Sequence, residues 1–407
     1  MNILIVSQYF YPENFRINEL ASEWVKDGHK VTVLTGIPNY PEGRYFPGYG
    51  LFNNREEIYK GAQVYRVPII PRGKNSNIRL ALNYLSFVLS GFIFAPWYCQ
   101  GDYDLVFVSQ LSPITMALPA ILMKKIKKAP LFLWVLDLWP ESLSATGAVR
   151  SPLAMSWADR LVRYIYRNTD RFLVASKAFI PSIERMGGDK DNIRYFPNWG
   201  ESIYEQNLID TPVVREANIP GGFKIMFAGN IGVAQDFGTI LKAAERLKDF
   251  SDIHWLVVGD GRMGDWVREQ VKSRTLSNVH MLGRYPMETM PAFFSQADVM
   301  LVTLKKDEIF SLTVPGKIQS YLACGKPVIA CLDGEGSSLI REAGAGLTCN
   351  SEDSESLAAA VLEMYRLPAG KRQNMGAQGR KYYEQNFMRS VLFANLQSWM
   401  KEAVLSK

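Results

Sequence analysis

Short apolar runs typical of buried strands alternate with helical segments along almost the whole chain. The first half holds runs such as NILIVS, KVTVLT and LFLWVL, with segments such as INELASEWVKDG between them. Runs that are nearly continuous in apolar residues are typical of parallel strands whose two faces are both covered by helices. The alternation therefore predicts an α/β fold built on parallel sheets.

This pattern lapses once, at residues 199–220, where the sequence is polar and has no clear period, and it restarts at residue 223. A chain of 407 residues is longer than one hydrophobic core normally supports. We therefore expect an N-terminal Rossmann-like domain of residues 1–198, a linker at 199–220 and a C-terminal Rossmann-like domain of residues 221–385. The amphipathic segment 386–407 is expected to pack back on the N-terminal domain.

The composition excludes several classes of protein. With 47% hydrophobic and 21% charged residues and a net charge of +6, the chain is neither disordered nor fibrous, and no nucleic acid partner is expected. Four cysteines without C-x-x-C spacing predict reduced thiols in a cytoplasmic protein. His29, His254 and His280 each stand at the edge of a predicted strand, which disfavours a catalytic triad or a histidine metal site. The immediate first strand also leaves no room for a secretory signal.

Two stretches allow contact with a membrane. Residues 79–98 form a long apolar run, but an asparagine, two serines and a glycine interrupt it. Because a span normally needs about 20 cleanly apolar residues, we expect a helix docked in the protein or lying at a membrane surface. The basic cluster MKKIKK at 123–128 is either a solvated helix end or a contact with anionic headgroups. Peripheral attachment to the inner face of the cytoplasmic membrane would use both stretches.

In doubly wound sheets, ligands bind outside the carboxyl ends of the strands. The loop after the first strand, residues 7–21, contains no glycine. A dinucleotide oxidoreductase needs G-x-G-x-x-G at this turn, so that class is disfavoured. Arg16 at the start of the next helix is a candidate for a phosphate or substrate contact, and the alternative is a surface pair with Glu19.

Glycine-containing turns follow two strands of the second half. The first holds Gly229, Asn230 and Gly232, and the second holds Gly259, Gly261 and Arg262. Such turns expose backbone N–H groups at helix starts and can cradle a phosphate, although either one alone could be only a tight turn. Together with the segment described next, they predict a nucleotide site.

The segment TVPGKIQSYLACG places Pro315, Gly316 and Lys317 directly before an apolar helical run. The first N–H groups of a helix have no partner within the helix, and a lysine beside them adds positive charge. This junction predicts a site for an anion.

In the first half, Asp137 stands at the end of the very apolar run LFLWVL. A carboxylate there is costly to bury unless it is hydrogen-bonded or has a task. We expect a functional role for Asp137, the alternative being a cap for the helix after Trp139-Pro140, and Glu141 is the second candidate acid. The D-x-D sequences at 102–104 and 189–191 precede strands, so we expect surface turns and no metal site.

In the order of its motifs, the chain resembles the family-four retaining glycosyltransferases of GT-B fold. These motifs are the NILIVSQYFYPE start, GHKVTVLT, DLWPES, AGNIG, VVGDG and the closing P-G-K-x-x-x-Y-L-A-C-G-K-P-V. The likeness extends over essentially the whole chain and is greatest to bacterial O-antigen and capsule enzymes that include L-fucosaminyl transferases. It implies two facing Rossmann-like domains with an interdomain cleft.

The resemblance also implies the substrates. A nucleotide sugar, expected to be a UDP-sugar, would bind mainly to the C-terminal domain, and a polyprenyl-diphosphate-linked saccharide to the N-terminal one. Transfer would retain the anomeric configuration without a metal or other cofactor, and the sugar would be one such as the N-acetylated deoxyhexosamine L-FucNAc.

The residue roles that the resemblance implies fall mostly in the C-terminal domain. Lys317 would neutralise charge on the donor diphosphate, and Asp137 would orient the sugar or the acceptor. Ser320 and Leu312 stand where many family members have glutamates, and Arg16 could supply positive charge. The remaining donor-binding candidates are Gly229, Asn230, Gln235, Gly259, Gly261, Arg262, Arg284, Thr313, Val314, Pro315 and Gly316.

Two other functions remain open at this point. The missing glutamates would suit a non-catalytic nucleotide-sugar-binding subunit of a polysaccharide assembly complex. A nucleotide-sugar 2-epimerase also uses paired Rossmann domains, and it would convert the donor without any acceptor.

Overall fold

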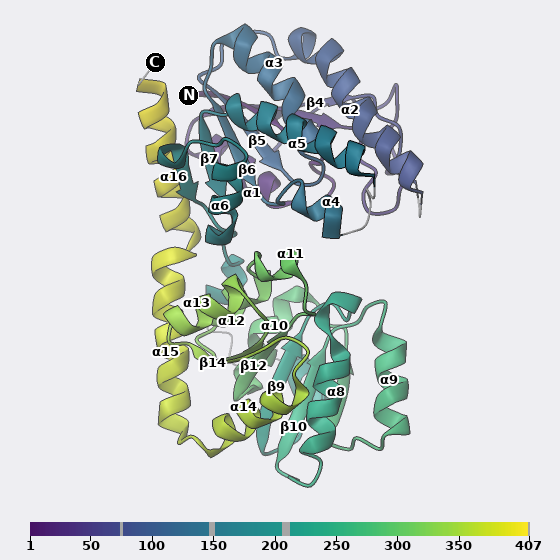
Figure 1. The fold of residues 1–407 in the computed structure, drawn as a ribbon, viewed down its shortest axis with the longest axis vertical. Coiled ribbons are helices and arrows are strands. Elements are labelled where there is room, and N and C mark those ends of the chain that lie inside the picture. The colour runs from purple at the N-terminus through teal and green to yellow at the C-terminus, as the bar shows by residue number, and fades with distance from the viewer. Residues whose placement is uncertain (74–75, 146–150, 206–211, 406–407) are drawn as a thin grey trace. The chain divides into compact units, whose positions relative to one another are not determined.

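The computed structural model describes residues 1–73, 76–145, 151–205 and 212–405, and it divides into two compact units (Figure 1). Unit 1 comprises residues 1–196 and 396–407, and unit 2 comprises residues 197–395. Each unit is built on one largely parallel sheet flanked by helices. The predicted α/β class with two Rossmann-like sheets is therefore confirmed.

Unit 1 contains an eight-stranded sheet in the order β3-β4-β2-β1-β5-β6-β7-β8. Its strands are β1 (Asn2–Val6), β2 (Lys30–Gly36), β3 (Glu56–Tyr59), β4 (Ala62–Val67), β5 (Leu105–Gln110), β6 (Leu131–Val135), β7 (Arg171–Val174) and β8 (Ile193–Tyr195). All neighbours are parallel except β3, which runs antiparallel to β4. The central strand β1 pairs with β2 on one side and β5 on the other, so the strand order reverses beside it.

Six of these strands coincide with the apolar runs in the sequence, whereas β3 and β8 do not. Both are edge strands, and only one side of each is paired. The sequence of β3 is EEIY, with Ile58 exposed, so it lacks the continuous apolar run of a strand covered on both faces.

The helices of unit 1 follow from right-handed crossovers. They are α1 (Arg16–Lys26), α2 (Asn77–Tyr98), α3 (Ala117–Lys127), α4 (Glu141–Ala145), α5 (Pro152–Arg167) and α6 (Ile180–Arg185), with short 3₁₀ turns η1 (Ile114–Met116), η2 (Lys177–Phe179) and η3 (Lys190–Asn192). The chain runs from β1 to β2 in one direction across the sheet, and from β4 to β5, β6 and β7 in the other. With right-handed crossovers, α1 therefore covers one face of the sheet, and α2, α3 and α5 cover the other. Helix α2 packs on α3 where Gly91 meets Pro119, and α3 packs in turn on α5.

The C-terminal helix α16 (Arg389–Leu405) contributes residues to both units. In unit 2, Phe393 packs edge-to-face on Trp199 at 4.8 Å. In unit 1, Trp399 packs on Phe196, and Glu402 pairs with Arg171 at 3.2 Å.

Unit 2 contains a six-stranded parallel sheet in the order β11-β10-β9-β12-β13-β14. Its strands are β9 (Phe223–Ala228), β10 (Ile253–Val258), β11 (Val279–Gly283), β12 (Val299–Thr303), β13 (Val328–Cys331) and β14 (Gly346–Cys349). Every one matches an apolar run in the sequence. Its helices are η4 (Ser202–Glu205), α7 (Pro212–Glu216), η5 (Val233–Gln235), α8 (Phe237–Arg246), α9 (Gly264–Ser273), η6 (Met287–Thr289), α10 (Met290–Gln296), α11 (Glu308–Ser311), α12 (Gly316–Ala323), α13 (Glu335–Glu342), α14 (Ser354–Arg366) and α15 (Ala369–Asn386).

One apolar core cluster of unit 2 lies between the sheet and helices α8 and α14. The apolar face of α8, including Ile240 and Leu241, packs with Leu357 and Val361 of α14 over the strands. The chain passes from β9 to β10 and β11 on one side of the sheet and then returns to β12 on the other side of β9. The strand order therefore reverses between β9 and β12, and the carboxyl ends of these two strands lie side by side. The predicted helix start at Gly316 is confirmed, although the short helix α11 separates it from β12.

The segment expected to be a linker contains η4 and α7, and residues 206–211 lie outside the described residues. Tyr204 of η4 stacks on Phe294 with ring centroids 5.4 Å apart. This part of the segment therefore packs within unit 2.

Cysteines and histidines occupy structural positions. All four cysteines are free, with Cys99 and Cys331 buried. His254 and His280 contact each other across β10 and β11, with 3.1 Å between their ring nitrogens, and burial lowers the pKa of His280. In the described part of the chain, no three His, Cys, Asp or Glu side chains form a group that could hold a metal ion.

Candidate functional site

Three adjacent strand ends of unit 2 are joined by their backbones. The Gly229 N–H donates to the Val258 carbonyl at 2.8 Å, and the Gly259 N–H donates to the Gly283 carbonyl at 2.7 Å. Gly229 and Gly259 have φ angles of +122° and +142°, and a Cβ on Gly259 would lie 2.0 Å from the Gly229 oxygen. Glycine suits both positions, because a side chain would be strained at these φ angles, and at Gly259 it would also collide with the backbone of Gly229.

Asn230 and Gly261 tighten the same pair of loops. The Ile231 N–H donates to the Asp260 carbonyl at 3.0 Å, and a Cβ on Gly261 would lie 2.5 Å from Asn230 Oδ1. The two predicted glycine turns therefore form one surface, which is called the glycine cradle below and comprises residues 229–232 and 259–261.

Helix α12 is anchored at the edge of this cradle by Tyr321. Its buried hydroxyl accepts from the Ala228 N–H and donates to the Ala228 carbonyl, both at 3.1 Å. These two bonds fix α12 against the last residue of β9. Sequence reasoning missed this positioning role, although Tyr321 belongs to the closing motif.

The anchored helix brings Lys317 over the cradle. A Cβ on Gly229 would lie 2.9 Å from Lys317 Cε and 3.3 Å from Nζ. The ammonium lies 3.5 Å from the ring centroid of Phe227, within the range of a cation–π contact. Its Nζ is buried and has no hydrogen-bond partner among the described residues.

A buried ammonium without a carboxylate partner is costly. Burial lowers the pKa of Lys317 to about 7 from its ordinary value of 10.5. An anion in the cradle would restore the charged form and provide the missing hydrogen bonds. Lys317 is therefore poised to receive a negatively charged group.

The start of α12 adds backbone donors beside Lys317. Pro315 occupies the N-cap position and provides no side-chain cap, and the Ile318 N–H bonds to the Pro315 carbonyl at 2.9 Å. The N–H groups of Gly316 and Lys317 belong to the first turn, which has no intrahelical acceptor. Thr313 and Val314 are half-buried and lead into this turn, with the Thr313 hydroxyl bonded to the Phe310 carbonyl at 3.1 Å.

The other donor-binding candidates of unit 2 lie around the cradle in different ways. Gln235 Oε1 accepts from the Gly232 N–H at 3.0 Å, so its side chain holds the cradle's own backbone. Arg262 and Arg284 are exposed and follow the glycines at the ends of their loops. Ser320 is turned back on α12, where its hydroxyl lies 3.4 Å from the Gly316 carbonyl.

In unit 1, Asp137 is half-buried and held by hydroxyl groups. One carboxylate oxygen accepts from Ser112 and the other from Ser142 at 2.5 Å. The Trp139 indole N–H donates to the same Ser112 hydroxyl at 2.9 Å. Asp137 thus contacts the side chain of Ser142 in α4, and its carboxylate has a fixed orientation.

The remaining acidic and basic candidates of unit 1 make ion pairs. Glu141 pairs with Arg185 at 2.6 Å, and Arg16 pairs with Glu19 at 3.1 Å. The two D-x-D sequences lie in turns, where Asp104 accepts from the Asn2 N–H and Asp189 caps η3. One carboxylate of each sequence therefore binds the protein's own backbone.

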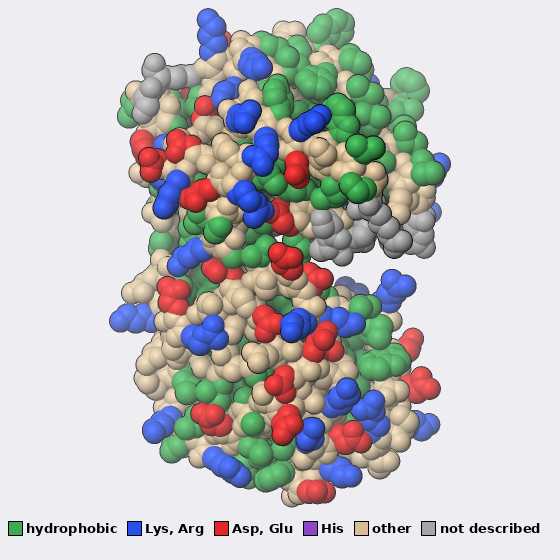
Figure 2. All heavy atoms as spheres, viewed as in Figure 1, with side chains coloured by type: hydrophobic (Ala, Val, Ile, Leu, Met, Phe, Trp, Pro, Cys, Tyr) green, Lys and Arg blue, Asp and Glu red, His purple; other side chains and the backbone are tan. Residues whose placement is uncertain are grey.

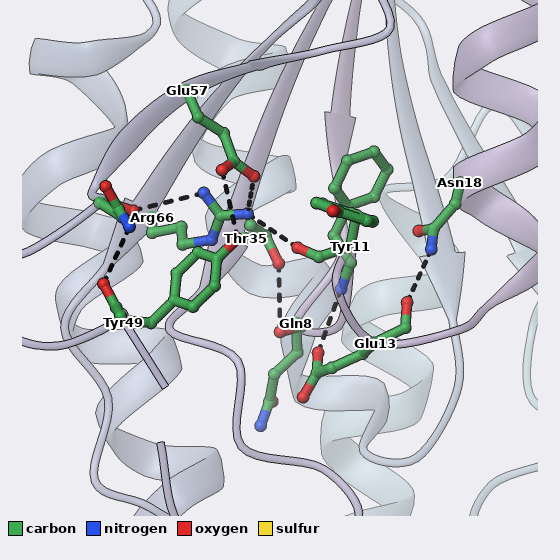
Figure 3. A network of polar contacts seen from close by, with 11 residues as sticks. Gln8, Tyr11, Glu13, Asn18, Thr35, Tyr49, Glu57 and Arg66 are labelled. Atoms are coloured by element: carbon green, nitrogen blue, oxygen red, sulfur yellow. Dashed lines mark hydrogen bonds and ion pairs between the residues drawn. The ribbon is translucent and has the colours of Figure 1, made fainter. Parts of the chain in front are cut away.

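A buried charged network in unit 1 was missed by the sequence reasoning (Figure 3). Glu13 is 2% exposed, and its carboxylate accepts from the N–H groups of Phe10, Asn39 and Tyr40 at 3.3, 2.8 and 2.7 Å. Burial raises the pKa of Glu13 to about 7, while the backbone hydrogen bonds lower it. The fully buried Arg66 lies close by.

Arg66 ties the loop after β1 to the edge of the sheet. Its guanidinium donates to the Tyr11 carbonyl at 2.7 Å, contacts the Glu57 carboxylate and lies 4.8 Å from the ring centroid of Tyr49. The signal in the sequence is only a charged residue within the apolar strand AQVYRV, which does not identify its partners.

An aromatic group lies beside this network at the carboxyl end of the sheet. Tyr9, Phe15 and Tyr40 have ring centroids 5.4 to 5.9 Å apart, and the Arg72 guanidinium lies 4.9 Å from the Tyr40 ring. Tyr40 is 40% exposed, so this group presents an aromatic surface flanked by a cation. Such a surface suits a polar ring-shaped ligand.

The two units thus differ in chemistry. Unit 2 offers glycine backbone, a helix start and an unpaired ammonium, a combination that binds phosphate groups. Unit 1 offers aromatic rings and oriented hydrogen-bonding side chains.

Comparison with known protein families assigns both units. Residues 14–199 match the family model described as "Glycosyl transferase 4-like domain", and residues 222–366 match the model described as "Glycosyl transferases group 1". The second match contains the glycine cradle and Lys317.

Two curated relatives are similar to this chain. "Putative colanic acid biosynthesis glycosyl transferase WcaI" of Escherichia coli is 24% identical over 90% of this chain and 93% of its own length. "Probable glycosyltransferase WbjE" of Pseudomonas aeruginosa is 27% identical over 63% of this chain and 65% of its own length.

Solved structures share the fold at low sequence identity. The sucrose-phosphate synthase of Thermosynechococcus elongatus has a TM-score of 0.74 at 15% identity, covering 100% of this chain and 99% of the other. Anabaena HepE, solved in complex with UDP, has a TM-score of 0.68 at 15% identity, covering 99% and 100%. The family models and the relatives agree, and the chain belongs to the group 1 glycosyltransferases of GT-B fold, with a glycosyltransferase 4-like N-terminal domain.

Proposed function

We propose that this chain transfers a sugar from a UDP-sugar to a lipid-linked saccharide, with retention at the anomeric carbon and without a metal or other cofactor. The observation that carries the proposal is the unpaired Lys317 ammonium buried over Gly229. A diphosphate is the group of the donor that matches this charge and the neighbouring backbone N–H groups.

The donor diphosphate would lie in the glycine cradle of unit 2. Gly229, Asn230 and the first turn of α12 would contact its oxygens, and Lys317 would pair with one of them. Gly259, Gly261 and the exposed Arg262 and Arg284 would lie toward the nucleoside, because they extend the cradle along the neighbouring strand ends. We propose further contacts with the donor from Gln235, Thr313, Val314, Pro315, Gly316 and Ser320.

The rate would come from stabilising the leaving group. As the bond between the anomeric carbon and the diphosphate oxygen breaks, charge accumulates on that diphosphate, where preorganised donors act most strongly. The acceptor hydroxyl then bonds to the anomeric carbon on the same face, and its proton passes to the departing phosphate oxygen. Lys317 becomes more fully protonated as that charge develops.

The acceptor would bind to unit 1. The aromatic group of Tyr9, Phe15 and Tyr40 offers a surface for a sugar ring, and Asp137, held by Ser112 and Ser142, would orient a hydroxyl. Arg16 at the start of α1 could meet a phosphate of a polyprenyl-diphosphate carrier.

The names of the relatives support a role in polysaccharide biosynthesis. WcaI is named for colanic acid biosynthesis, and HepE was solved with UDP and with UDP-glucose. We propose O-antigen or capsule synthesis as the setting and an N-acetylated deoxyhexosamine such as L-FucNAc as the transferred sugar.

The test compares two half-buried lysines of unit 2. Lys317→Met should lower UDP affinity by about 2 kcal/mol, or roughly thirtyfold, because it removes a charged partner of the diphosphate. Turnover of a UDP-sugar should fall at least as far, while the unliganded protein should melt at the same or a higher temperature, since a buried unpaired charge is removed.

Lys326→Met is the matched control, because Lys326 donates to the carbonyls of Ser295 and Ala297 at 2.8 Å each. This variant should lower stability and leave UDP affinity unchanged. Calorimetric titration with UDP and release of UDP from candidate UDP-sugars are the measurements. Equal UDP affinity in wild type and Lys317→Met would overturn the diphosphate assignment.

A further inference from the structure

Helix α2 carries a continuous row of exposed apolar side chains, even though it belongs to a folded unit. Within the described residues, it is the one helix long and apolar enough to cross a membrane by length and composition. Successive members of the row stand three or four residues apart, so they share one side of the helix. This apolar ridge consists of Ile78, Leu82, Leu85, Leu89, Ile93 and Trp97.

The opposite side of α2 is packed into unit 1, which argues against a span. Phe87 and Ala95 are fully buried, and Gly91 lies directly against Pro119 of α3. The buried Asn83 accepts from Gln8 at 2.7 Å and donates to the Ile70 carbonyl at 2.6 Å. Since these contacts hold α2 in unit 1, the exposed side of the helix, which includes the apolar ridge, is available to a partner.

Helix α5, which packs on α3, carries two further exposed apolar side chains. Leu153 and Trp157 in its first turns are 76% and 68% exposed, and the Arg160 guanidinium lies 5.5 Å from the Trp157 ring. Figure 2 shows apolar side chains gathered over the part of unit 1 where α2 lies. Exposed tryptophans at the borders of an apolar surface are typical of proteins that rest at a membrane–water interface.

Positive charge surrounds the ends of these helices. Helix α2 contains one charged residue, Arg79, and no acid. Lys127 at the end of α3 donates to the Gly101 carbonyl just after α2, and Lys124 donates to the Asn168 carbonyl just after α5. The basic cluster thus lies where the C-terminal ends of all three helices meet.

A pocket of about 550 Å³ opens within this cluster, at the amino ends of β6 and β7. It is lined by three lysines, Arg171 and one carboxylate, Asp170, which pairs with Lys124 at 2.7 Å, while Arg171 pairs with Glu402 at 3.2 Å. Arg171 is 7% exposed, and its buried Nε and Nη1 have no hydrogen-bond partner in the described part of the chain. This lysine pocket consists of Lys124, Lys125, Lys128, Ala129, Pro130, Asp170, Arg171 and Ala403.

We propose that unit 1 docks on an anionic phospholipid bilayer, with the apolar ridge inserted at the interface and a phosphate headgroup in the lysine pocket. Apolar burial and attraction to anionic lipid act together in such surface binding. A second copy of this chain fits less well, because a symmetric contact would bring two lysine pockets into the same interface. The inference is independent of the transfer reaction, because vesicle binding needs no donor.

The experiment is co-sedimentation of the full chain with vesicles of phosphatidylcholine alone or with about a third phosphatidylglycerol. We expect at least tenfold more binding to the anionic vesicles, and weaker binding as salt is raised. Leu85→Glu/Leu89→Glu should lower that binding at least tenfold. Phe250→Glu/Met287→Glu is the matched control, since both residues are exposed apolar side chains of unit 2, and it should bind like wild type.

Lys125→Glu/Lys128→Glu should remove the preference for anionic vesicles, whereas Lys371→Glu/Lys381→Glu on α15 should keep most of it. Melting curves check that each variant is folded. Equal binding to both kinds of vesicle, or a dimer in sedimentation that Leu85→Glu/Leu89→Glu dissolves, would overturn the proposal. Wild-type protein that resists extraction from membranes by alkaline carbonate would indicate a span and overturn it as well.

Discussion

The loops that follow the first strand of each sheet handle negative charge in opposite ways. After β9, glycines bring backbone close to an ammonium that has no hydrogen-bond partner among the described residues. After β1, the loop has no glycine, and the Glu13 carboxylate accepts three backbone N–H groups. The same position in two similar folds is therefore open to an anion in unit 2 and already occupied by the chain's own anion in unit 1.

This difference explains how one architecture can serve two roles. A phosphate group would compete with the Glu13 carboxylate for the backbone N–H groups of unit 1. In unit 2 it would instead contact the ammonium of Lys317. Because Glu13 occupies these amides, the groups that remain for a ligand at the carboxyl ends of the unit 1 strands are aromatic rings and hydroxyl groups. Such groups suit a neutral sugar.

The largest effect should come from filling the glycine cradle. Gly259→Ala should cost about 3 kcal/mol or more of stability in unit 2, because it combines a strained φ with a collision against the Gly229 carbonyl. Gly283→Ala is the control, since Gly283 also has a positive φ of +85° but no atom within 4 Å of its Cβ position, so we expect about 1 kcal/mol. Denaturant unfolding measures both, and equal costs would contradict the close contact between the loops.

A smaller but sharper test removes the internal anion of unit 1. Glu13→Ala should cost about 2 kcal/mol or more, because three backbone N–H groups lose their acceptor. Glu13→Gln keeps an oxygen acceptor and should cost less. Both variants should bind UDP like wild type. A loss of UDP affinity comparable to that of Lys317→Met would contradict the claim that only the loop of unit 2 receives the diphosphate.

The pH dependence should carry opposite signs in the two units. Lys317 has its pKa lowered to about 7, so between pH 7 and about 10.5 the unfolded chain holds a proton that the folded one has released, and stability rises with pH. Glu13 has its pKa raised to about 7, so between pH 4.5 and 7 the folded chain holds the extra proton, and stability falls as pH rises.

Melting temperatures of wild type, Lys317→Met and Glu13→Gln across pH 4.5 to 10 check these signs, because each variant should lose only its own slope. UDP affinity should also fall above pH 7 in wild type, since anion binding needs the ammonium. An unchanged pH profile in Lys317→Met would show that another group titrates.

Much of the fold could be predicted because each central strand is buried on both faces of its sheet. Such a strand consists of a nearly continuous apolar run, which is visible in the sequence. The edge strands β3 and β8 of unit 1 were not predicted, because they are less covered and lack such an apolar run. In the candidate site, Gly229, Gly259 and the start of α12 were recognisable, since glycine and a helix start have local signatures. The hydrogen bonds of Tyr321 to Ala228 have no such signature, because they depend on which strand neighbours which.

The sequence by itself determined the α/β class, the existence of two Rossmann-like units and the positions of the glycine turns, because these depend on local periodicity and backbone freedom. Only the tertiary structure decided that Lys317 lies unpaired over Gly229 and that Glu13 fills the corresponding place in unit 1. Both arrangements follow from strand order, which brings together residues far apart in the chain and sets how much water each charge retains.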